Sequence, residues 1–498
     1  MSATSMVRNV YTRDLVEWDD KWNLIPVIAE KVPSLENGLM KLLPGNKLQV
    51  TYKLRKGLKW SDGEPITADD VIFTYKAIMN DDLKVPTRDT EVKIESITAP
   101  DKYTVVIIFK EPYVLADQGF DYYIIPKHAL EPLLAKGAKA FMEAEFSRKP
   151  VGNGPYLVKE WVPGSHIILE PNPNYNIGSK PKLKKVIFKF ISDTNTLMAN
   201  MVSGAIDAVT PVGLQFDQGV ALEKQAKDVS VDFTSALVWE HIDFNLDDPI
   251  LKDKRVRQAL TYAIDREAIS QALFEGKQKV AHSWLPPKHY AYNSKVKVYN
   301  YDEAKARALL AEAGWKPGPD GILVNDKGER LSLTIGTTAG NKVREQVEQI
   351  IQSYYKKIGV ELKIENQTAK VFFGETTPKR KFQMAMYAWV NSPSTVGESL
   401  WTARNIPNDG NGWTGQNRAG WNNAENEKLY AEIPVTMDKK KRIALLQREQ
   451  ELWAEELPAI PLYYRVDISA VRKGLQNWRP TGMLHPITWN IEKWSWSE

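Results

Sequence analysis

The sequence predicts a mixed α/β protein with at least two lobes, and three observations lead to that prediction. Several segments alternate apolar and polar residues with the period of two that is typical of a strand, most clearly over 48–54. The segment 331–364 combines a strand, an amphipathic helix and a second strand, so we expect a parallel βαβ unit. Breaker-rich joints lie near 150–155 and 245–265, and 498 residues are enough for about three domains.

The first elements along the chain are strands with one well-marked helix. The strand over 48–54 follows a Pro-Gly-Asn turn, and a buried strand is expected over 103–109. Between them, Thr67 and Asp70 have the spacing of a capping box, with Asp in place of the usual Glu. This spacing predicts a helix that begins directly after Thr67.

The middle of the chain continues as strands. A hairpin is expected from 156–162 and 166–170, because Pro163-Gly164 lies between two apolar runs. A further strand is predicted over 185–191, and two separate strands over 229–233 and 239–245.

The second half of the chain is richer in helices. An apolar stripe over 256–264 predicts one helix, and Asp302 and Gly314 predict the beginning and the end of another. The helix of the βαβ unit should bury Val343, Val347, Ile350, Ile351 and Tyr354. The remaining predicted elements are a strand over 382–389, a helix over 439–456 and a strand over 459–466.

Composition excludes several classes of protein. The 66 basic and 62 acidic residues give a net charge of +4 without a basic stripe, which argues against a nucleic-acid binder. There is no cysteine, so disulfides, thiolate metal sites and cysteine nucleophiles are excluded. The longest apolar stretch, about seven residues, is far too short to span a membrane, and residues 1–7 do not form a secretory signal.

No catalytic, cofactor or metal motif is recognised. The six histidines lack metal-binding spacing, and Gly152-Asn153-Gly154 lacks the third glycine of a dinucleotide loop. The aromatic residues, which include 16 tryptophans, are more informative, because such side chains line sites for peptides and sugars. Trp239 and Trp389 each have two interpretations, a core position or a cleft wall. Trp389 is followed by the polar loop Asn391-Ser392-Pro393-Ser394 at a strand end, where α/β folds place ligands.

Several segments in order resemble the extracytoplasmic solute-binding proteins of the oligopeptide/dipeptide/nickel ABC-importer family. Each segment alone is a weak signal, but their order and spacing across nearly the whole chain are highly specific. The matching segments are YKLRKGLKWSDG at 52–63, PITADDV at 65–71, GNGPY at 152–156, NPNY at 172–175, DKRVRQAL at 253–260, AIDR at 263–266, 304–315 and IGV at 358–360.

The resemblance implies a two-lobe periplasmic-binding-protein fold, class II-like and of cluster C, with the first lobe split into two subdomains around a hinge. The implied division is lobe Ia over 1–15, 151–262 and 470–498, lobe Ib over 16–150, and lobe II over 263–469. Relatives also have a signal peptide and a first strand of lobe I before the segment that matches 7–15. Both are absent from this sequence, so the resemblance implies a shortened form of an exported protein, periplasmic or membrane-anchored.

The resemblance also implies ligand-binding residues. Trp239 and Asn245 match a cleft-facing strand, Tyr387 and Trp389 match a strand that pairs with an extended ligand, and Tyr463 and Tyr464 match a tyrosine-rich strand. Peptide binders of the family usually have an aspartate three residues after the tryptophan, where it pairs with the peptide amine. Here that position is Ser392, next to Asn391, and Glu398 is a possible substitute acid. A free amine in the usual pose is therefore in doubt, because a buried ammonium without a carboxylate is costly.

The resemblance implies a monomeric binding protein that traps an oligopeptide between its lobes and delivers it to an ABC transporter permease, without catalysis, metal or cofactor. An oligosaccharide is the alternative ligand, because tryptophan faces suit sugars and the amine-binding aspartate is missing. A glycoside hydrolase is a distant alternative from another class, for which the sequence offers no motif.

Overall fold

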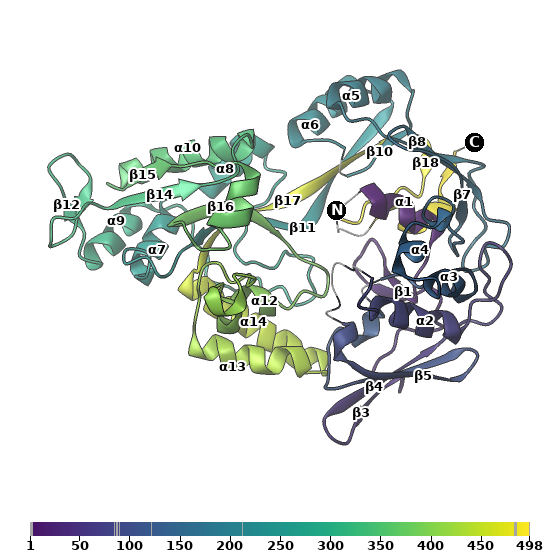
Figure 1. The fold of residues 1–498 in the computed structure, drawn as a ribbon. Coiled ribbons are helices and arrows are strands. Elements are labelled where there is room, and N and C mark those ends of the chain that lie inside the picture. The colour runs from purple at the N-terminus through teal and green to yellow at the C-terminus, as the bar shows by residue number, and fades with distance from the viewer. Residues whose placement is uncertain are drawn as a thin grey trace. The chain divides into compact units, whose positions relative to one another are not determined.

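The computed structural model describes residues 3–83, 85, 88, 90–120, 122–211, 213–482 and 486–497, with side chains from residue 6 onward. The chain divides into two compact units (Figure 1). Unit 1 comprises Met1–Thr234 and Asp467–Glu498, and unit 2 comprises Ser235–Val466. Both units contain helices and strands, in agreement with the predicted α/β class.

A four-stranded antiparallel sheet with strand order β3-β4-β6-β5 forms the first layer of unit 1. Strands β4 (Lys47–Lys53) and β6 (Thr104–Phe109) confirm the two strands predicted there, and alternate side chains on both are buried. The neighbouring elements are α1 (Ala3–Tyr11), β1 (Val16–Trp18), β2 (Leu24–Pro26), β3 (Met40–Leu43), β5 (Ile94–Asp101), α3 (Lys127–Leu134) and α4 (Ala138–Met142).

Helix α2 (Ala68–Ile78) begins where the capping box predicts it. The Thr67 N–H donates to the Asp70 carboxylate at 2.8 Å, which satisfies a backbone donor that the first turn would otherwise leave unpaired. The same carboxylate accepts the N–H of Lys127 at 2.9 Å, so the cap also fixes the beginning of α3. Asp70 therefore joins a local signal to the tertiary packing of the two helices.

A three-stranded antiparallel sheet in unit 1 contains the hairpin predicted over 156–162 and 166–170 and the strand predicted over 185–191. It contains β7 (Tyr156–Val162), β8 (His166–Pro171) and β9 (Val186–Lys189) in that order. Gly164, with a φ of 75°, makes the turn between β7 and β8. Helices α5 (Thr194–Ser203) and α6 (Phe216–Gln225) follow, with the short strand β10 (Ala208–Val209) between them.

The largest sheet has six strands in the order β10-β17-β11-β16-β14-β15. The prediction of two strands over 229–233 and 239–245 is wrong, because β11 (Val229–Phe244) is one continuous strand. No proline or glycine interrupts 234–238, so nothing breaks the extended backbone there. Strand β17 (Ala459–Arg472) likewise extends beyond the predicted 459–466, and its end pairs with β10. Both boundaries between the units fall inside these two strands.

The βαβ unit of unit 2 is confirmed. Strands β14 (Ser332–Gly336) and β15 (Glu361–Ile364) pair in parallel, and α10 (Lys342–Lys357) connects them. The predicted buried face of α10 is partly wrong, because Val343 is 38% exposed. The buried face includes Arg344 instead, whose guanidinium pairs with the carboxylate of Glu240 on β11. The ion pair of Arg344 therefore attaches α10 to the sheet. Apolar periodicity instead predicted that the neighbouring Val343 would be buried.

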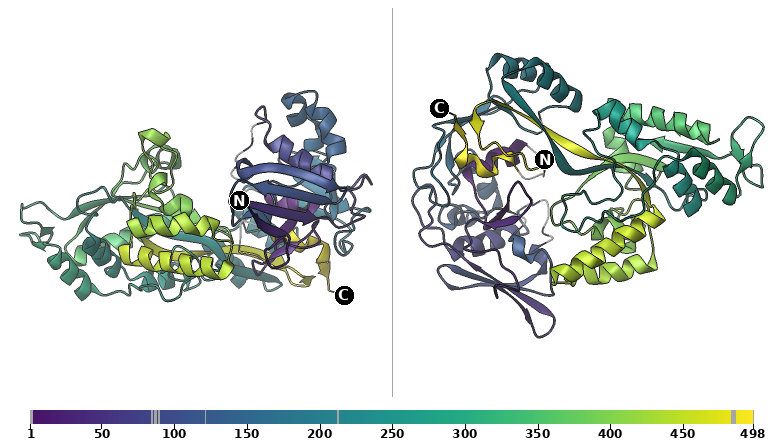
Figure 2. Two further views of the ribbon diagram at one scale, coloured as in Figure 1. Left: turned by 90° about the horizontal axis from the view of Figure 1, so that it is seen from below. Right: turned by 180° about the vertical axis from the view of Figure 1, so that it is seen from behind.

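The remaining helices of unit 2 largely follow the sequence pattern. The Asp302 carboxylate accepts the N–H of Lys305 at 2.9 Å and caps α9, and Gly314, with a φ of 94°, follows its last turn. Helices α13 and α14 pack against each other (Figure 2). The helices are α7 (Lys254–Tyr262), α8 (Arg266–Phe274), α9 (Glu303–Glu312), α11 (Ala369–Val371), α12 (Glu398–Trp401), α13 (Ala424–Glu432) and α14 (Lys439–Glu456). Short strand pairs are β12 (Lys316–Pro317) with β13 (Leu323–Val324), and β18 (Leu475–Gln476) with β19 (Ser495–Trp496) in unit 1.

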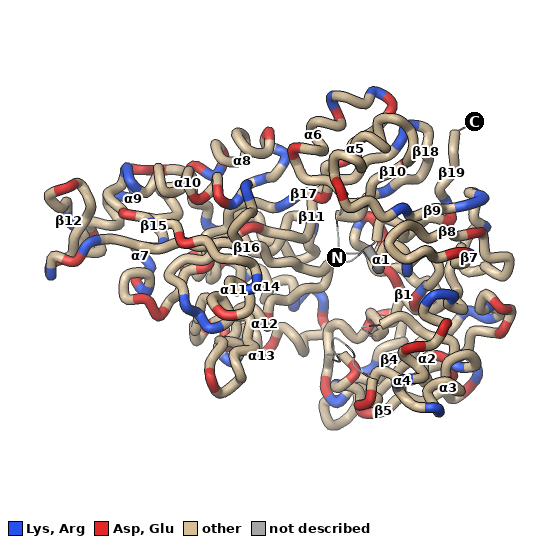
Figure 3. Tube along the Cα trace, turned by 45° about the horizontal axis from the view of Figure 1, so that its top comes forward, with Lys and Arg blue, Asp and Glu red and all other residues tan. Residues whose placement is uncertain are grey.

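Charged side chains of both signs are interspersed along both units (Figure 3). This distribution fits the small net charge of +4 and shows no basic stripe along the described chain. Within the described ranges, no helix combines the length and the apolar character that crossing a bilayer requires.

Candidate functional site

Three of the predicted site residues lie with a histidine on one face of the sheet in unit 2. Strands β11 and β16 (Met384–Val390) pair antiparallel, with Trp239 opposite Trp389 and His241 opposite Tyr387. Directly opposed residues point to the same face, so these four rings form a ladder across the two strands. The rings of His241 and Tyr387 meet edge to face at 4.5 Å between centroids.

The Trp239 end of this ladder belongs to the core of unit 2. Trp239 is 0% exposed, stacks on His241 at 4.3 Å, and meets Trp401 and Trp453 at 6.4 and 5.8 Å between ring centroids. Trp453 lies on α14, so the helices of the carboxyl-terminal half of unit 2 cover this end of the ladder. The Trp239 side chain is therefore a core residue of unit 2, and its contact with a ligand stays a prediction.

Tyr387 connects the ladder to two charged groups. Its hydroxyl donates to the buried carboxylate of Asp243 on β11. Burial, and then the neighbouring Asp243 charge, raise the pKa of Tyr387 well above its ordinary value, although the Arg418 guanidinium opposes the shift. Tyr387 is therefore a neutral hydrogen-bond donor at every physiological pH.

The Trp389 end of the ladder reaches the surface. Trp389 is only partly buried, and its ring meets that of Tyr387 edge to face at 5.6 Å. The guanidinium carbon of Arg418 lies 5.1 Å from the Trp389 ring centroid and 5.2 Å from that of Tyr387. Phe373, 41% exposed, extends this aromatic surface beside Tyr387. We call these four residues, Phe373, Tyr387, Trp389 and Arg418, the Trp389 wall.

The polar loop after β16 is held by hydrogen bonds within unit 2. The Asn391 N–H donates to the Leu237 carbonyl at 2.8 Å, and its side-chain amide donates to the Trp284 carbonyl at 2.9 Å. Ser392 is exposed, and its N–H donates to the Thr395 hydroxyl at 2.6 Å. Asn391 therefore anchors the loop, whereas Ser392 presents a neutral hydroxyl at its tip.

Three other predicted residues, Glu398, Asn245 and Tyr464, each have a partner within unit 2. Glu398, the first residue of α12, pairs with Arg404. The Asn245 amide donates to the carbonyls of Arg380 and Phe382 at 3.0 and 2.9 Å and so supports the segment before β16. Tyr464 is buried in the core of unit 2, where its hydroxyl donates to the Ser283 carbonyl at 2.8 Å.

Tyr463 lies on β17, and its ring packs against Phe274 of α8 at 4.7 Å between centroids. Strand β11 separates β17 from β16 in the sheet order. The structure thus brings Tyr387, Trp389, Asn391 and Ser392 together along one strand and its loop. Asn245 lies at the opposite end of the β11–β16 pair, because Phe244 pairs with Met384, the first residue of β16. Arg418 is the functional candidate that sequence analysis missed, since an isolated arginine in an Asn/Gly-rich loop has no periodic signal.

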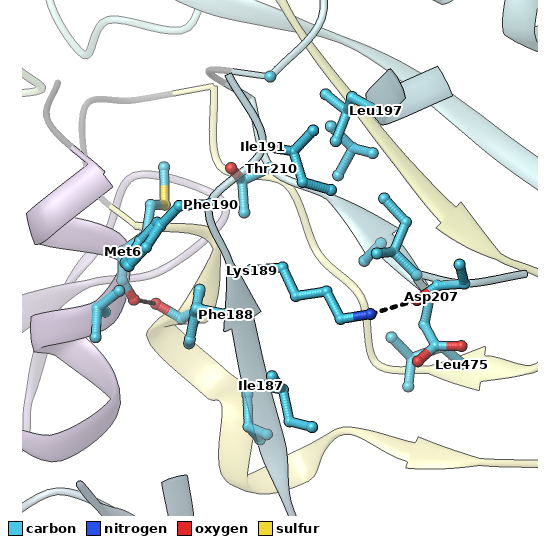
Figure 4. A pocket seen from close by; sticks show the side chains of 18 of the residues that line it. Met6, Ile187, Phe188, Lys189, Phe190, Ile191, Leu197, Asp207, Thr210 and Leu475 are labelled. Carbon is cyan, nitrogen blue, oxygen red and sulfur yellow. Dashed lines mark hydrogen bonds between the residues drawn. The ribbon is translucent and has the colours of Figure 1, made fainter. Parts of the chain in front are cut away.

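A cavity of about 650 Å³ lies within unit 1, apart from these residues (Figure 4). It lies between β9 and β10, each of which is the last strand of its sheet. The Phe190 N–H donates to Ser165 beside β8, so the alternate residues Ile187 and Lys189 turn their backbone groups toward the cavity. Lys189 extends across it and donates to the Ala205 carbonyl at 3.0 Å. Two strand edges without a described neighbour thus flank an apolar slot.

A second cavity of about 460 Å³ in unit 1 is lined by the Asp14 carboxylate and aromatic side chains that include Trp18 and Phe120. Burial raises the pKa of Asp14 well above its ordinary value, and the nearby Arg8 opposes that shift. The lining of this cavity thus includes an acid, Asp14, and a basic residue, Arg8, lies near that acid.

Comparison with known proteins identifies a family. The model of the bacterial extracellular solute-binding proteins, family 5, matches residues 24–411. The oligopeptide-binding protein AppA of Bacillus subtilis (strain 168) is 31% identical over 99% of this chain and 87% of its own length. The dipeptide-binding protein of Escherichia coli (strain K12) is 26% identical over 94% of this chain and 86% of its own.

Solved structures agree in fold. The oligopeptide binding protein from Thermus thermophilus, complexed with a pentapeptide, is 33% identical with a TM-score of 0.73 over 100% of this chain and 92% of that one. The structure of AppA from Bacillus subtilis in complex with a nonapeptide is 30% identical, also with a TM-score of 0.73, over 100% of this chain and 95% of that one. These likenesses confirm the predicted α/β, two-lobe fold class.

Proposed function

Because the chain belongs to the bacterial extracellular solute-binding proteins of family 5, we propose that it binds oligopeptides outside the cytoplasm and delivers them to an ABC importer. The observation that supports this most strongly is similarity along 99% of the chain to a protein named as an oligopeptide binder. Similarity to a protein solved with a bound pentapeptide supports it further. The comparisons give the oligosaccharide alternative no support.

The Trp389 wall is the part of the predicted site best suited to touch a ligand. Trp389 is partly exposed at the end of β16, and aromatic rings supply large apolar contact areas to peptide side chains. Beyond it, Ser392 offers a hydroxyl, and Asn391 fixes the loop between them. We propose that Trp389, Asn391 and Ser392 contact the peptide, and that the buried Tyr387 supports Trp389 from behind. Ligand contacts of Trp239, Asn245, Tyr463 and Tyr464 stay predictions.

The chain acts by binding, without chemistry. Its relatives are solute-binding proteins, and the residues of the Trp389 wall include no pair of acid and base or nucleophile and base that a hydrolase needs. We propose further that the protein acts as a monomer, and that it is periplasmic or anchored to the outer face of a membrane, as an importer's binding component must be.

We also propose the three-part division that the family resemblance implies, with 1–15, 151–262 and 470–498 in lobe Ia, 16–150 in lobe Ib and 263–469 in lobe II. The four-stranded sheet of unit 1 falls entirely within 16–150, and the β7-β8-β9 sheet falls within 151–262, which supports the split. The boundary between the two compact units lies instead between Thr234 and Ser235, inside β11. Beyond that boundary, from Val238 onward, β11 pairs with β16 of unit 2.

The function is tested by calorimetry with a panel of tripeptides to nonapeptides and a matched panel of β-linked disaccharides. We expect at least one peptide to bind with a micromolar or lower Kd and to raise the melting temperature, by mass action, in proportion to its saturation. Neither panel should be hydrolysed on prolonged incubation. Binding of a disaccharide without any peptide, or turnover of either, would contradict the proposal.

A further inference from the structure

The acids expected to meet a peptide amine are missing or occupied near Trp389. Ser392, at the position of the usual aspartate, is neutral, and its hydroxyl lies 3.1 Å from the Thr395 hydroxyl. Glu398, the possible substitute, forms an ion pair with Arg404. The loop after β16 therefore provides no unpaired carboxylate from either of these two positions.

A cation occupies the adjacent surface instead. Arg418 lies between Asn417 and Ala419, which are 0% and 1% exposed. The Ala419 carbonyl accepts the N–H of Leu246 at 2.9 Å, and the Arg418 carbonyl accepts the Nε–H of Arg380 at 3.0 Å. The backbone that bears this arginine is thus fixed on both sides, which keeps the guanidinium beside Trp389 without the entropy loss of ordering a flexible loop.

The guanidinium is held by one hydroxyl and by aromatic rings. Its Nη1 donates to the buried Thr377 hydroxyl at 2.8 Å, and its carbon lies 5.1 Å from the Trp389 ring centroid and 6.0 Å from that of Phe373. A cation over aromatic rings is attracted by their electron-rich faces, which holds the guanidinium beside Trp389.

Among the described residues, no Asp or Glu forms an ion pair with Arg418. Within the same part of the chain its Nε has no hydrogen-bond partner. Asp243 is buried, and its carboxylate accepts the Tyr387 hydroxyl. The neighbouring Asp247 pairs with Arg380 at 2.7 Å. The Trp389 wall thus has an oriented cation that lacks a carboxylate of its own.

We propose that Arg418 recognises a carboxylate of the bound peptide, so that the Trp389 wall selects for an acidic group. Hydrogen bonds between a guanidinium and a carboxylate are charge-assisted and are among the strongest in proteins. The carboxylate belongs to the peptide's C-terminus or to an acidic side chain. This inference rests on the proposed function and names the ligand class that the site prefers.

The test uses the tightest pentapeptides found in a library by thermal shift, each made in four forms. These are the free acid, the C-terminal amide, the N-acetylated acid, and a form with any Glu or Asp replaced by its amide. Losing the recognised carboxylate should weaken binding about 10- to 100-fold, the range of a charge-assisted hydrogen bond. The C-terminal amide and the side-chain amide distinguish the two sources, and acetylation should change affinity less than about 3-fold.

Arg418→Gln should abolish the difference between acid and amide forms, whereas Arg418→Lys should keep part of it, because lysine retains the charge without the planar fork. Arg330→Gln, which removes an exposed arginine paired with Asp320, serves as the matched control. Circular dichroism and melting temperature check that each variant folds. Equal discrimination in wild type and Arg418→Gln, or a loss on acetylation that exceeds the loss on amidation, overturns the inference while peptide binding stands. No binding of any peptide to the wild-type protein overturns the proposed function and this inference together.

Discussion

Two tryptophans occupy opposed positions on neighbouring strands, yet only one of them is fully buried. Trp239 on β11 is enclosed by Trp401, Trp453 and His241, whereas Trp389 on β16 is partly exposed beside Arg418. The sheet gives both rings the same orientation, so strand geometry does not cause the difference. The helices and loops that cover one end and leave the other open decide which tryptophan supports the fold and which can meet a ligand.

The largest expected effect is a loss of stability at Trp239, which distinguishes it from Trp389. Trp239→Ala should lower the free energy of unfolding by about 3 to 5 kcal/mol, because it opens a cavity in a fully buried aromatic cluster. Chemical denaturation of the variant measures this loss. Trp161→Ala, at a position 41% exposed, is the control and should change stability little. If Trp239→Ala unfolds at the wild-type midpoint but binds no peptide, Trp239 belongs to the ligand site and the comparison fails.

The converse change at Trp389 should affect binding. Trp389→Ala should weaken peptide binding by about 2 kcal/mol or more, since it removes the largest ring of the Trp389 wall. Its free energy of unfolding should fall less than that of Trp239→Ala, because part of the ring already faces solvent. Calorimetric titration and denaturation of the same preparation give both quantities. A loss of stability as large as that of Trp239→Ala would assign Trp389 to the core as well.

A third, pH-dependent effect probes the covered end of the ladder. Burial raises the pKa of Glu449, which accepts the Trp284 indole N–H at 2.9 Å, from 4.5 to about 8. Folding therefore takes up a proton between those values, so the stability that this group contributes is present below pH 4.5 and is lost as pH rises through about 8. Glu449→Gln cannot ionise and should gain stability relative to wild type as pH rises from 5 to 8.5, by about 3 to 4 kcal/mol at about 1.4 kcal/mol per pKa unit.

Denaturation at pH 5 and pH 8.5 measures how the difference in free energy of unfolding between Glu449→Gln and wild type changes with pH. Glu432→Gln, at an exposed glutamate paired with Lys441, is the matched control and should show no such trend. A difference between wild type and Glu449→Gln that stays constant with pH would mean that Glu449 is not protonated in the folded state.

Local signals predicted much of the fold. The Thr67 and Asp70 cap, the hairpin around Gly164 and the βαβ unit each depend on residues close in sequence, and the structure contains all three. The break within β11 was mispredicted because 234–238 has neither strong alternation nor a breaker. The buried position of Arg344 was missed because its partner, Glu240, lies about a hundred residues away on another strand.

The site was predictable only in part. Strand alternation and the polar loop pointed to Trp389, Asn391 and Ser392, which do lie together. The same alternation could not distinguish Trp239 from Trp389, because the burial of Trp239 depends on elements distant in sequence, such as α14, which supplies Trp453. Arg418 had no sequence signal at all, since only folding brings its loop against β16.

The most direct test of peptide binding is mass spectrometry of the ligand that the purified protein releases on denaturation. The protein is isolated from a culture grown on a protein hydrolysate, beside the Trp389→Ala variant and the Trp161→Ala control. We predict a set of peptides, enriched in free carboxylates, from the wild type and the control, and a much smaller amount from Trp389→Ala. Release of oligosaccharides, or equal peptide recovery from all three proteins, would contradict peptide binding at the Trp389 wall.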